Sequence, residues 1–445
     1  MPEHNCHFIE HEKQQVSLTP TGEHFREKLR KYFQSQVEQS GYYASVFQKL
    51  GLDVTCDPLD VLGELPATTK EIYRETLQLE SMTRLNERTF VTDFSSGSTA
   101  DSVLRLCAPT DDLAEQAVTE GVFSSVGMGP DDHFVCMDIG APDIYDFYFR
   151  AARNLGVPRC SFLHLGSEYA TACRPLIQLR PSIFLTVPSL MIRAWPVIGN
   201  YWSTKDCPIK TVIHMGEPMH DTFRKEVEST WGCAVRSFYG TTETGGMGID
   251  CAEKDGIHFE PRAFLATLEK AEQVDKNEFE GEVLFTTLHV RTQSVIKYRV
   301  GDRVRLTAAP CSCGNTMPRL KFIERTHEAF MIAGEKFSHS MILEGLQESA
   351  PNLPLANLII EDLAAAEGDA LLRVQLPDTY REQESEFLET LQTSIFELDA
   401  LYHYGHVKFE LEFLPIEQIQ GRKIAKVRDH RLHMSHTAES GSAES

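Results

Sequence analysis

The hydrophobic pattern of this chain changes character along its length. Between Phe25 and Leu50, apolar residues recur at every third or fourth position, which predicts a helical N-terminal region. A capped helix start follows at Thr69, after Leu65 and Pro66. Between residues 132 and 231, short apolar runs alternate with amphipathic stretches, a pattern typical of βα units in a mostly parallel sheet. We therefore predict an α/β fold class, in which loops at the strand ends bind ligands.

The second half of the chain is richer in predicted strands. Apolar segments separated by turn residues predict strands at 282–288, 294–300 and 302–308. Further strands are expected at 356–363, 370–376 and 407–414, around a helix at 382–398. We predict a large N-terminal domain with a β-rich subdomain (1–324), a small mobile α+β C-terminal domain (325–435) and a disordered tail (436–445). The first 20 residues are polar, and we expect them to be loose and to carry no chemistry.

Composition and charge narrow the classes of partner. With 445 residues, 42% hydrophobic and 24% charged, the chain has ample material for a large core. It contains no apolar stretch approaching the roughly 18 residues that a membrane helix needs, and its N-terminus is polar, so we expect a cytoplasmic protein without a membrane partner. The formal net charge of -22 disfavours nucleic acid and anionic lipid. An anionic substrate must therefore be bound by local cations and backbone amides.

Three short motifs offer groups that bind phosphate, metal or ribose. Ser95-Ser96-Gly97-Ser98-Thr99 provides hydroxyls and backbone N–H groups after a β-like segment. Tyr239-Gly240-Thr241-Thr242-Glu243 combines two hydroxyls with a carboxylate suited to Mg²⁺. In Tyr298-Arg299-Val300-Gly301-Asp302, the final carboxylate can accept from ribose hydroxyls. Taken singly, the first motif is more often an ordinary loop, the second is compatible with a glycine-rich turn, and the third with a surface salt bridge.

Taken together and in this order, the motifs resemble those of phenylacetate-CoA ligases in the adenylate-forming, AMP-binding superfamily. Further counterparts lie at 65–70, 281–288 and 311–314, so the resemblance covers roughly residues 25–430. It implies an AMP-forming acid–thiol ligase that uses ATP and Mg²⁺ to convert a carboxylic acid, of the aryl class, into an acyl-adenylate with release of pyrophosphate. Coenzyme A is the first candidate for the thiol that then takes the acyl group.

The resemblance also implies roles for individual residues. Thr242, Glu243 and Lys423 would be catalytic, with Glu243 binding Mg²⁺ and Lys426 as the reserve for the mobile lysine. Tyr239 would lie between nucleotide and acid, and Asp302 with Arg325 would hold the ribose. The remaining nucleotide contacts would come from the hydroxyl loop, the tyrosine-glycine motif and a turn beside the adenine, namely Ser95, Ser96, Gly97, Ser98, Thr99, Gly240, Thr241, Gly216, Glu217 and Pro218.

A lysine has a clear physical task in this reaction. Attack of a carboxylate on the α-phosphate brings two anions together, and a point cation lowers that barrier. A lysine near the end of a small mobile domain can be delivered for this step and withdrawn before the thiol attacks. The competing interpretation of Lys423 is a solvated basic run, because Arg422, Lys426 and Arg428 lie close to it in sequence.

A second candidate site consists of Cys251, His258, Cys311 and Cys313. Three thiolates and one imidazole form a recognised structural zinc set, although these spacings are not those of a zinc finger. Some phenylacetate-CoA ligase relatives resemble this chain in carrying the same set. We expect a structural Zn²⁺ here, while most of the other cysteines, such as Cys107, Cys136 and Cys160, lie singly in apolar surroundings, as small buried thiols do.

The chain also departs from the family pattern. Ala100-Asp101-Ser102 stands where the family has Gly-Lys-Pro, so the hydroxyl loop lacks a lysine and gains a carboxylate that would repel a triphosphate. Arg422 replaces a glycine beside the lysine, and His327 stands at the hinge. These changes keep two alternatives open: transfer of the acyl group to a carrier-protein thiol or an amine, and a degenerate ligase that senses nucleotide or acid. The acid is expected between the Tyr239 motif and the segment 138–148, with His214 nearby, and a homodimer is possible.

Overall fold

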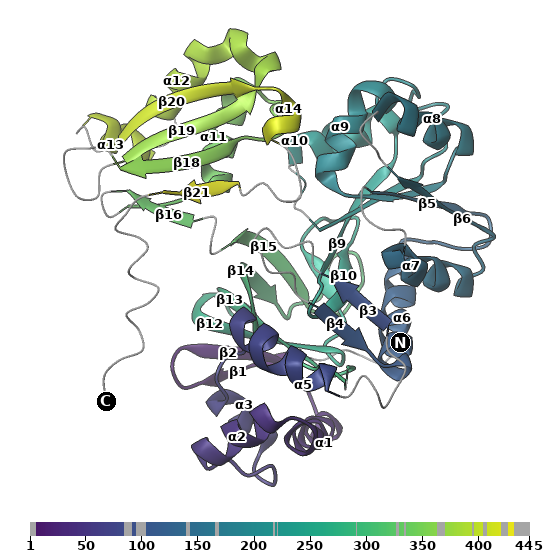
Figure 1. The fold of residues 1–445 in the computed structure, drawn as a ribbon, viewed down its shortest axis with the longest axis vertical. Helices are drawn as coiled ribbons and strands as arrows, with labels where there is room; N and C mark the ends of the chain where they lie inside the picture. The colour runs from purple at the N-terminus through teal and green to yellow at the C-terminus, as the bar shows by residue number, and fades with distance from the viewer. Residues whose placement is uncertain are drawn as a thin grey trace. The chain divides into compact units, whose positions relative to one another are not determined.

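The computed structural model describes most of the chain, with several gaps. The described residues are 6–83, 91–94, 104–138, 143–164, 169–216, 219, 221–290, 292–325, 329–332, 335–362, 370–393, 396–403, 407–419 and 426–430. Contacts divide the chain into a large unit, 1–219 with 226–323, and a small unit, 220–225 with 324–445 (Figure 1). That the small unit moves as a domain stays a prediction.

The large unit contains the predicted parallel sheet. Its five strands pair in the order β9, β8, β7, β5, β6, and every pairing is parallel. The strands are β5 (His133–Asp138), β6 (Arg159–His164), β7 (Ile183–Thr186), β8 (Thr211–Met215) and β9 (Ala234–Thr241). The helices of this region are α6 (Pro109–Ser125), α7 (Asp143–Asn154), α8 (Tyr169–Leu179), α9 (Pro188–Ile198) and α10 (Asp221–Trp231). The predicted α/β fold class is confirmed.

The same sheet continues from β9 into an antiparallel region. Its strands are β10 (Gly245–Asp250), β11 (Ile257–Phe259), β12 (Phe264–Asp275), β13 (Glu278–Thr287), β14 (Tyr298–Thr307) and β15 (Arg319–Arg325). From β9 the order is β10, β11, β15, β14, β13, β12. The prediction of two strands at 294–300 and 302–308 is wrong, because a single strand, β14, runs through Gly301. That glycine has φ of 80°, and the register with β13 shifts beside it, so the turn-like residue marks a bulge instead of a turn.

The N-terminus is more ordered than its polarity suggests. β1 (Cys6–His11) and β2 (Gln15–Pro20) form a hairpin, and β2 pairs with β12 to extend the large sheet. Within β2, Ser17 is fully buried and its hydroxyl lies 2.8 Å from that of Thr267. The expectation that residues 1–20 are loose is therefore wrong for 6–20, because long-range strand pairing satisfies the polar groups of this segment.

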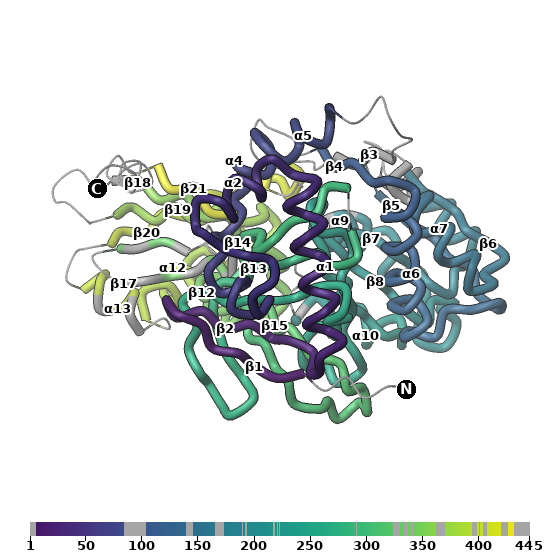
Figure 2. Tube along the Cα trace, turned by 90° about the horizontal axis from the view of Figure 1, so that it is seen from below, coloured from purple at the N-terminus to yellow at the C-terminus, as the bar shows by residue number. Residues whose placement is uncertain are grey.

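The predicted helical N-terminal region is present, and its helices pack against this antiparallel region. They are α1 (Glu23–Gln39), α2 (Gly41–Leu50), α3 (Pro58–Glu64), α4 (Lys70–Ile72), the π-helical turn η1 (Tyr73–Leu77) and α5 (Gln78–Met82). Leu29 and Phe33 of α1 pack in one core with Leu265 of β12. Figure 2 shows the trace of α1 beside the strands of this region. The predicted cap at Thr69 is present, since its side chain accepts from the Ile72 N–H.

A buried lysine joins three of these elements. Lys297, just before β14, is fully buried, and its Nζ donates to Gln15 Oε1 at 2.6 Å and to the carbonyls of Leu62 and Leu65 at 3.3 and 2.5 Å. Burial lowers the pKa of this amine to about 8. Lys297 therefore ties β2 and the C-terminal end of α3 to β14.

We expect the stability cost of Lys297→Met to depend on pH. Between about pH 8 and the ordinary lysine pKa of about 10.5, the unfolded chain holds a proton that the folded chain has released, so folding gains stability as pH rises through this window. The variant lacks that gain. Thermal midpoints should therefore differ more between wild type and variant at pH 9.5 than at pH 7, and an equal difference at both pH values would contradict the shifted pKa.

The small unit has an α+β arrangement. Its four-stranded sheet has the order β20 (Val407–Leu414), β19 (Ala370–Pro377), β18 (Asn357–Asp362), β21 (Val427–Asp429), and β16 (Ala329–Ile332) pairs with β17 (Glu335–Ser338). Its other elements are α11 (His339–Ser349), the 3₁₀ turn η3 (Asp378–Gln383), α12 (Glu384–Thr393), α13 (Phe396–His403) and α14 (Ile416–Ile419). The helix expected at 382–398 coincides with α12 and the start of α13, and residues 394–395 lie outside the described residues. No described helix of either unit is long and apolar enough to span a bilayer.

Candidate functional site

The turn between β9 and β10 carries the tyrosine-glycine motif. β9 ends at Thr241 and β10 begins at Gly245, with Thr241 opposite Gly245 and Gly240 opposite Gly246. A Cβ on Gly240 would lie 2.6 Å from the Gly245 carbonyl oxygen, so the hairpin closes this tightly only with glycine. The Thr241 hydroxyl accepts from the Thr244 N–H at 3.2 Å. The turn is thereby fixed, with Glu243 half-buried near its tip.

Two tyrosine–carboxylate hydrogen bonds link this hairpin to β14. The Tyr239 hydroxyl donates to Asp302 Oδ2 at 2.6 Å, and the Tyr298 hydroxyl donates to Glu243 Oε1 at 2.7 Å. Asp302 is buried, and so is Tyr298. The structure thus brings together three residues that the sequence singled out for nucleotide and metal, namely Tyr239, Glu243 and Asp302. Tyr298 had no assigned role, although it opens the motif that ends at Asp302.

The strand that follows the hydroxyl loop lies close to the same turn. Ser95 to Thr99 are outside the described residues, but the flanking strands β3 (Val91–Phe94) and β4 (Leu104–Cys107) pair antiparallel, with Phe94 opposite Leu104. On β4, buried Arg105 donates to Glu115 Oε2 of α6 at 3.0 Å. A Cβ on Gly245 would lie 3.1 Å from that Glu115 carboxylate. A buried ion pair therefore lies between the strand after the hydroxyl loop and the turn that carries Glu243.

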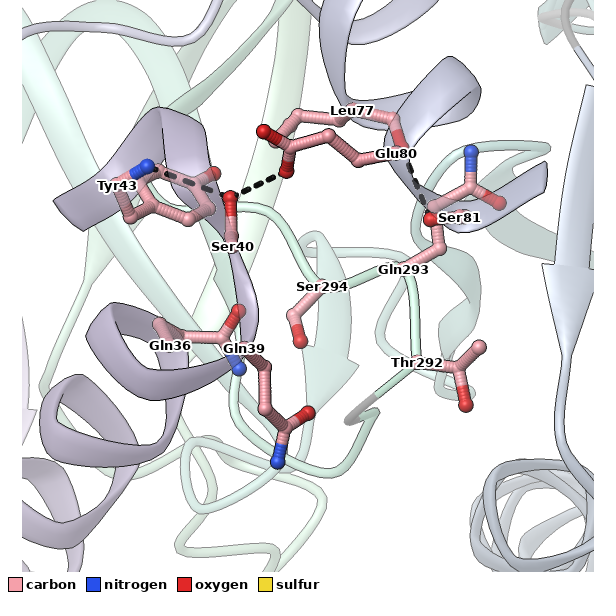
Figure 3. A pocket seen from close by; sticks show the side chains of 10 residues that line it. All are labelled: Gln36, Gln39, Ser40, Tyr43, Leu77, Glu80, Ser81, Thr292, Gln293 and Ser294. Atoms are coloured by element: carbon pink, nitrogen blue, oxygen red, sulfur yellow. Dashed lines mark hydrogen bonds between the residues drawn. The ribbon is translucent and has the colours of Figure 1, made fainter. Parts of the chain in front are cut away.

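A small polar pocket lies beside β4, lined by residues of α1, α2, η1, α5 and the segment 292–294 (Figure 3). Within it, Glu80 accepts from the Ser40 hydroxyl at 2.7 Å and from the Tyr42 N–H at 2.8 Å, which caps α2. Gln293 accepts from the Leu106 N–H at 2.7 Å and so holds β4. These bonds hold the start of α2 and the strand β4 in place.

Several predicted residues are only partly described. Gly216 follows β8 with φ of 78°, whereas Glu217 and Pro218 lie outside the described residues. Arg325 is the last residue of β15, and only its backbone is described. Lys423 is outside the described residues, so its role stays a prediction. Lys426, the reserve, lies just before β21, and its carbonyl accepts from the Leu358 N–H at 2.7 Å.

The end of the parallel sheet where the acid is expected is also partly described. Asp138 ends β5, and His214 lies near the end of β8 with 2% of its surface exposed. Residues 139–142 are outside the described residues, and of Tyr145 only the backbone is described. Tyr148 of α7 contacts Phe238 of β9, with ring centroids 6.0 Å apart. Polar and aromatic groups therefore occur near this edge, and the position of the acid stays a prediction.

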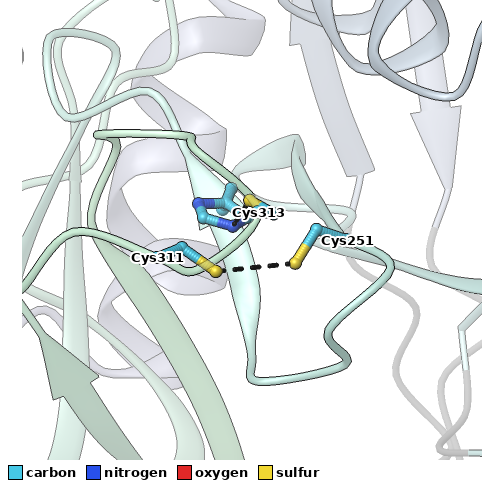
Figure 4. Close-up of side chains that lie close together, drawn as sticks. Cys251, Cys311 and Cys313 are labelled. Atoms are coloured by element: carbon cyan, nitrogen blue, oxygen red, sulfur yellow. Dashed lines mark hydrogen bonds between the residues drawn. The ribbon is translucent and has the colours of Figure 1, made fainter.

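The four proposed zinc ligands lie together in the large unit (Figure 4). Cys251 follows β10, His258 is on β11, and Cys311 and Cys313 lie between β14 and β15. Their ligand atoms are all within 4.8 Å of one another. The Sγ atoms of Cys251 and Cys311 are 3.7 Å apart, and His258 Nε2 is 3.5 Å from Cys313 Sγ.

This donor set fits a tetrahedral zinc ion. Sulfur atoms about 2.3 Å from such an ion are about 3.8 Å from each other, close to the observed separation. His258 Nδ1 lies 3.3 Å from the Met317 carbonyl oxygen, so it donates there and leaves Nε2 to face the thiols. Burial lowers the pKa of His258, which favours the neutral imidazole that binds metals.

Comparisons with known proteins agree with the sequence resemblance. No protein-family model matches the chain. It is 23% identical over 208 residues to the phenylacetate-coenzyme A ligase of Thermus thermophilus, covering 45% of this chain and 46% of that protein. It is 23% identical over 300 residues to the Escherichia coli enzyme of the same name, covering 64% of this chain and 66% of that protein. It is 24% identical over 319 residues to that of Aromatoleum evansii, covering 69% of this chain and 71% of that protein. The chain thus spans about half the length of the first relative and about two thirds of the others.

Solved structures show the fold. A crystal structure of 2-hydroxyisobutyryl-CoA ligase in the postadenylation state, in complex with R3-HIB-AMP, matches with a TM-score of 0.72 at 19% identity, covering 93% of this chain and 90% of that one. The ATP-bound MatB of Rhodopseudomonas palustris matches with a TM-score of 0.50 at 16% identity, covering 68% of this chain and 60% of that one. At these identities the likeness concerns the fold alone.

Proposed function

We propose that this chain, which is phenylacetate-CoA ligase-like in sequence and has the fold of adenylate-forming ligases, activates a carboxylic acid with ATP and passes the acyl group to coenzyme A. The observation that carries the proposal is the pair of tyrosine–carboxylate bonds, which gathers Tyr239, Glu243 and Asp302 at one turn. A metal-binding carboxylate and a ribose-binding carboxylate are the groups that this chemistry needs there.

The proposed reaction has two steps. A carboxylate oxygen of the acid attacks the α-phosphorus of ATP, and the bond to pyrophosphate breaks, which gives the acyl-adenylate. The coenzyme A thiolate then attacks the acyl carbon, and AMP leaves. An aryl acid with a polar substituent suits the aromatic and polar residues expected around it, among them Tyr148 and His214.

Individual residues support these steps in the proposal. Glu243 would hold Mg²⁺, which neutralises charge on the phosphates of ATP. Asp302, with Arg325, would accept from the ribose hydroxyls, and the hydroxyls of Ser95 to Thr99 and Thr242 would receive the phosphates. Lys423 would bring a positive charge to the α-phosphate during the first step. The buried Arg105–Glu115 pair supports the arrangement because it lies between β4, the strand that follows the hydroxyl loop, and the turn that carries Glu243.

We also propose that the four-residue cluster of Cys251, His258, Cys311 and Cys313 binds Zn²⁺ in a structural role. All four positions are filled by protein ligands, which is typical of structural sites, whereas catalytic zinc keeps an open position. Cys251 directly follows β10, the strand that begins at the Glu243 turn, and Cys311 lies beyond β14, the strand of Asp302. A metal here would fix these strands relative to one another.

Product analysis tests the proposed function directly. Purified protein is incubated with ATP, Mg²⁺, coenzyme A and a panel of benzoates, phenylacetates and short aliphatic acids, and products are identified by mass spectrometry. We expect AMP and one acyl-CoA in equal amounts, with an aryl acid as the best substrate. AMP and pyrophosphate formed without any acyl-CoA would favour a carrier-protein or amine acceptor. An absence of both products with every acid would contradict the proposal.

A further inference from the structure

We propose that Tyr298 is a positioning residue, which fixes the Glu243 carboxylate in the place where it meets the magnesium ion. This inference rests on the proposed function, because it takes Glu243 as the magnesium ligand. The observation is the hydrogen bond of 2.7 Å from the Tyr298 hydroxyl to Glu243 Oε1. Tyr298 is buried and a carboxylate oxygen only accepts, so the phenol hydroxyl is the donor of this bond.

Tyr298 is itself held from several directions. Its backbone pairs with Phe285 of β13 on one side and with Thr68 on the other. The Thr68 N–H donates to the Lys297 carbonyl at 2.9 Å, and the Thr68 carbonyl accepts from the Arg299 N–H at 3.0 Å. The ring of Tyr73 packs against it, with centroids 5.6 Å apart. Tyr73 begins the π-helical turn η1, an irregularity often found near functional sites. Tyr298 has 3% of its surface exposed and is therefore a fixed donor for the half-buried carboxylate of Glu243, which lies on a turn.

The two tyrosine–carboxylate bonds form a reciprocal link. β14 contributes the donor Tyr298 and the acceptor Asp302, while the β9–β10 hairpin contributes the donor Tyr239 and the acceptor Glu243. β14 and β9 are not neighbours in the sheet, because β15, β11 and β10 lie between them. The side-chain bonds therefore set the distance between the carboxylate proposed for magnesium and the one proposed for ribose.

This link defines how Glu243 would bind a cation. Oε1 accepts from the phenol, which fixes the orientation of the carboxylate that would hold a magnesium ion. Carboxylates that bind metals depend on such hydrogen-bonding partners, and loss of the partner commonly costs about 10- to 100-fold in metal affinity or activity. Tyr298→Phe removes the donor and keeps the buried ring that packs against Tyr73.

The test measures metal binding instead of turnover. Manganese, a spectroscopic substitute for magnesium, is titrated by electron paramagnetic resonance into the full chain with a non-hydrolysable ATP analogue. We expect Tyr298→Phe to bind Mn²⁺ about 10- to 100-fold more weakly than wild type, while metal-free binding of a fluorescent ATP analogue stays within a few-fold. Because the two residues act together, Tyr298→Phe should add little to the loss caused by Glu243→Gln.

Tyr32→Phe is the matched control. Tyr32 is also fully buried, and its hydroxyl donates to the Val295 carbonyl at 3.3 Å, so the variant loses a buried phenol hydroxyl near β14 without touching Glu243. We expect its Mn²⁺ affinity to equal that of wild type. Unchanged Mn²⁺ affinity in Tyr298→Phe, or an equal loss in both variants, would overturn the positioning role alone. A wild-type chain that binds neither nucleotide nor Mn²⁺ would overturn the proposed function as well.

Discussion

Replacing Lys423 with alanine is expected to slow adenylation on the order of 10²- to 10³-fold or more, the cost of losing one main charge contact in a transition state. The reason is electrostatic, because the anionic acid and the α-phosphate approach each other and the transferred oxygens gain charge. The rate is measured as acid-dependent pyrophosphate formation in a single turnover. Affinity for ATP should change much less, since the other nucleotide contacts remain.

Lys426→Ala provides the control for this prediction. Lys426 carries the same charge three positions further along, and its backbone is held by a 2.7 Å bond from the Leu358 N–H beside β21. We expect this variant to adenylate within a few-fold of wild type. Coenzyme A should also react normally with acyl-adenylate supplied to Lys423→Ala, because the lysine serves the first step only. Equal losses in both variants would point to a general basic surface, and a loss in Lys426→Ala alone would move the role to that residue.

Replacing Cys311 with serine is expected to remove zinc and to destabilise the large unit severely. Wild-type protein purified without chelator should hold one zinc ion per chain by elemental analysis. In zinc-finger peptides, structural zinc contributes on the order of 10 kcal/mol to folding. Part of that energy should be lost here, as a fall of many degrees in thermal midpoint or as insoluble protein. The cause would be the loss of the metal that links three segments: the one after β10, the strand β11, and the turn between β14 and β15.

Cys56→Ser is the matched control for the zinc prediction. Cys56 is exposed and lies outside the cluster, so its loss removes a thiol without removing a ligand. We expect full zinc content and an unchanged thermal midpoint. Wild-type protein without stoichiometric zinc, or a chelator-treated protein that melts at the same temperature, would contradict a structural metal.

Local periodicity was enough to predict the parallel half of the sheet and the N-terminal helices. β5, β7 and β8 are short runs buried on both faces, so their continuous apolar character is visible without knowing their neighbours. β2 was missed because its polar residues are buried only through pairing with β12, about 250 positions later. Likewise, the sequence predicts a turn at Gly301, since it does not distinguish a bulge within a strand from the end of one.

In the candidate site too, some residues are recognisable from local sequence and others only from contacts between distant segments. Tyr239, Glu243 and Asp302 were found by motif, and the four metal-type ligands by residue type and order. The role of Tyr298 is not visible in the sequence, because its contact with Glu243 joins residues 55 positions apart and depends on the sheet between them. A tyrosine in a β-rich segment gives no sign of which carboxylate its hydroxyl will meet.

Pyrophosphate exchange tests most directly whether this chain makes acyl-adenylates. Radiolabelled pyrophosphate is incubated with the protein, ATP, Mg²⁺ and one acid at a time, and the label that enters ATP is counted. Reversible adenylation predicts label in ATP with at least one aryl acid and none without acid, whether or not coenzyme A is present. No label with any acid, from protein that is folded and soluble, would contradict adenylate formation.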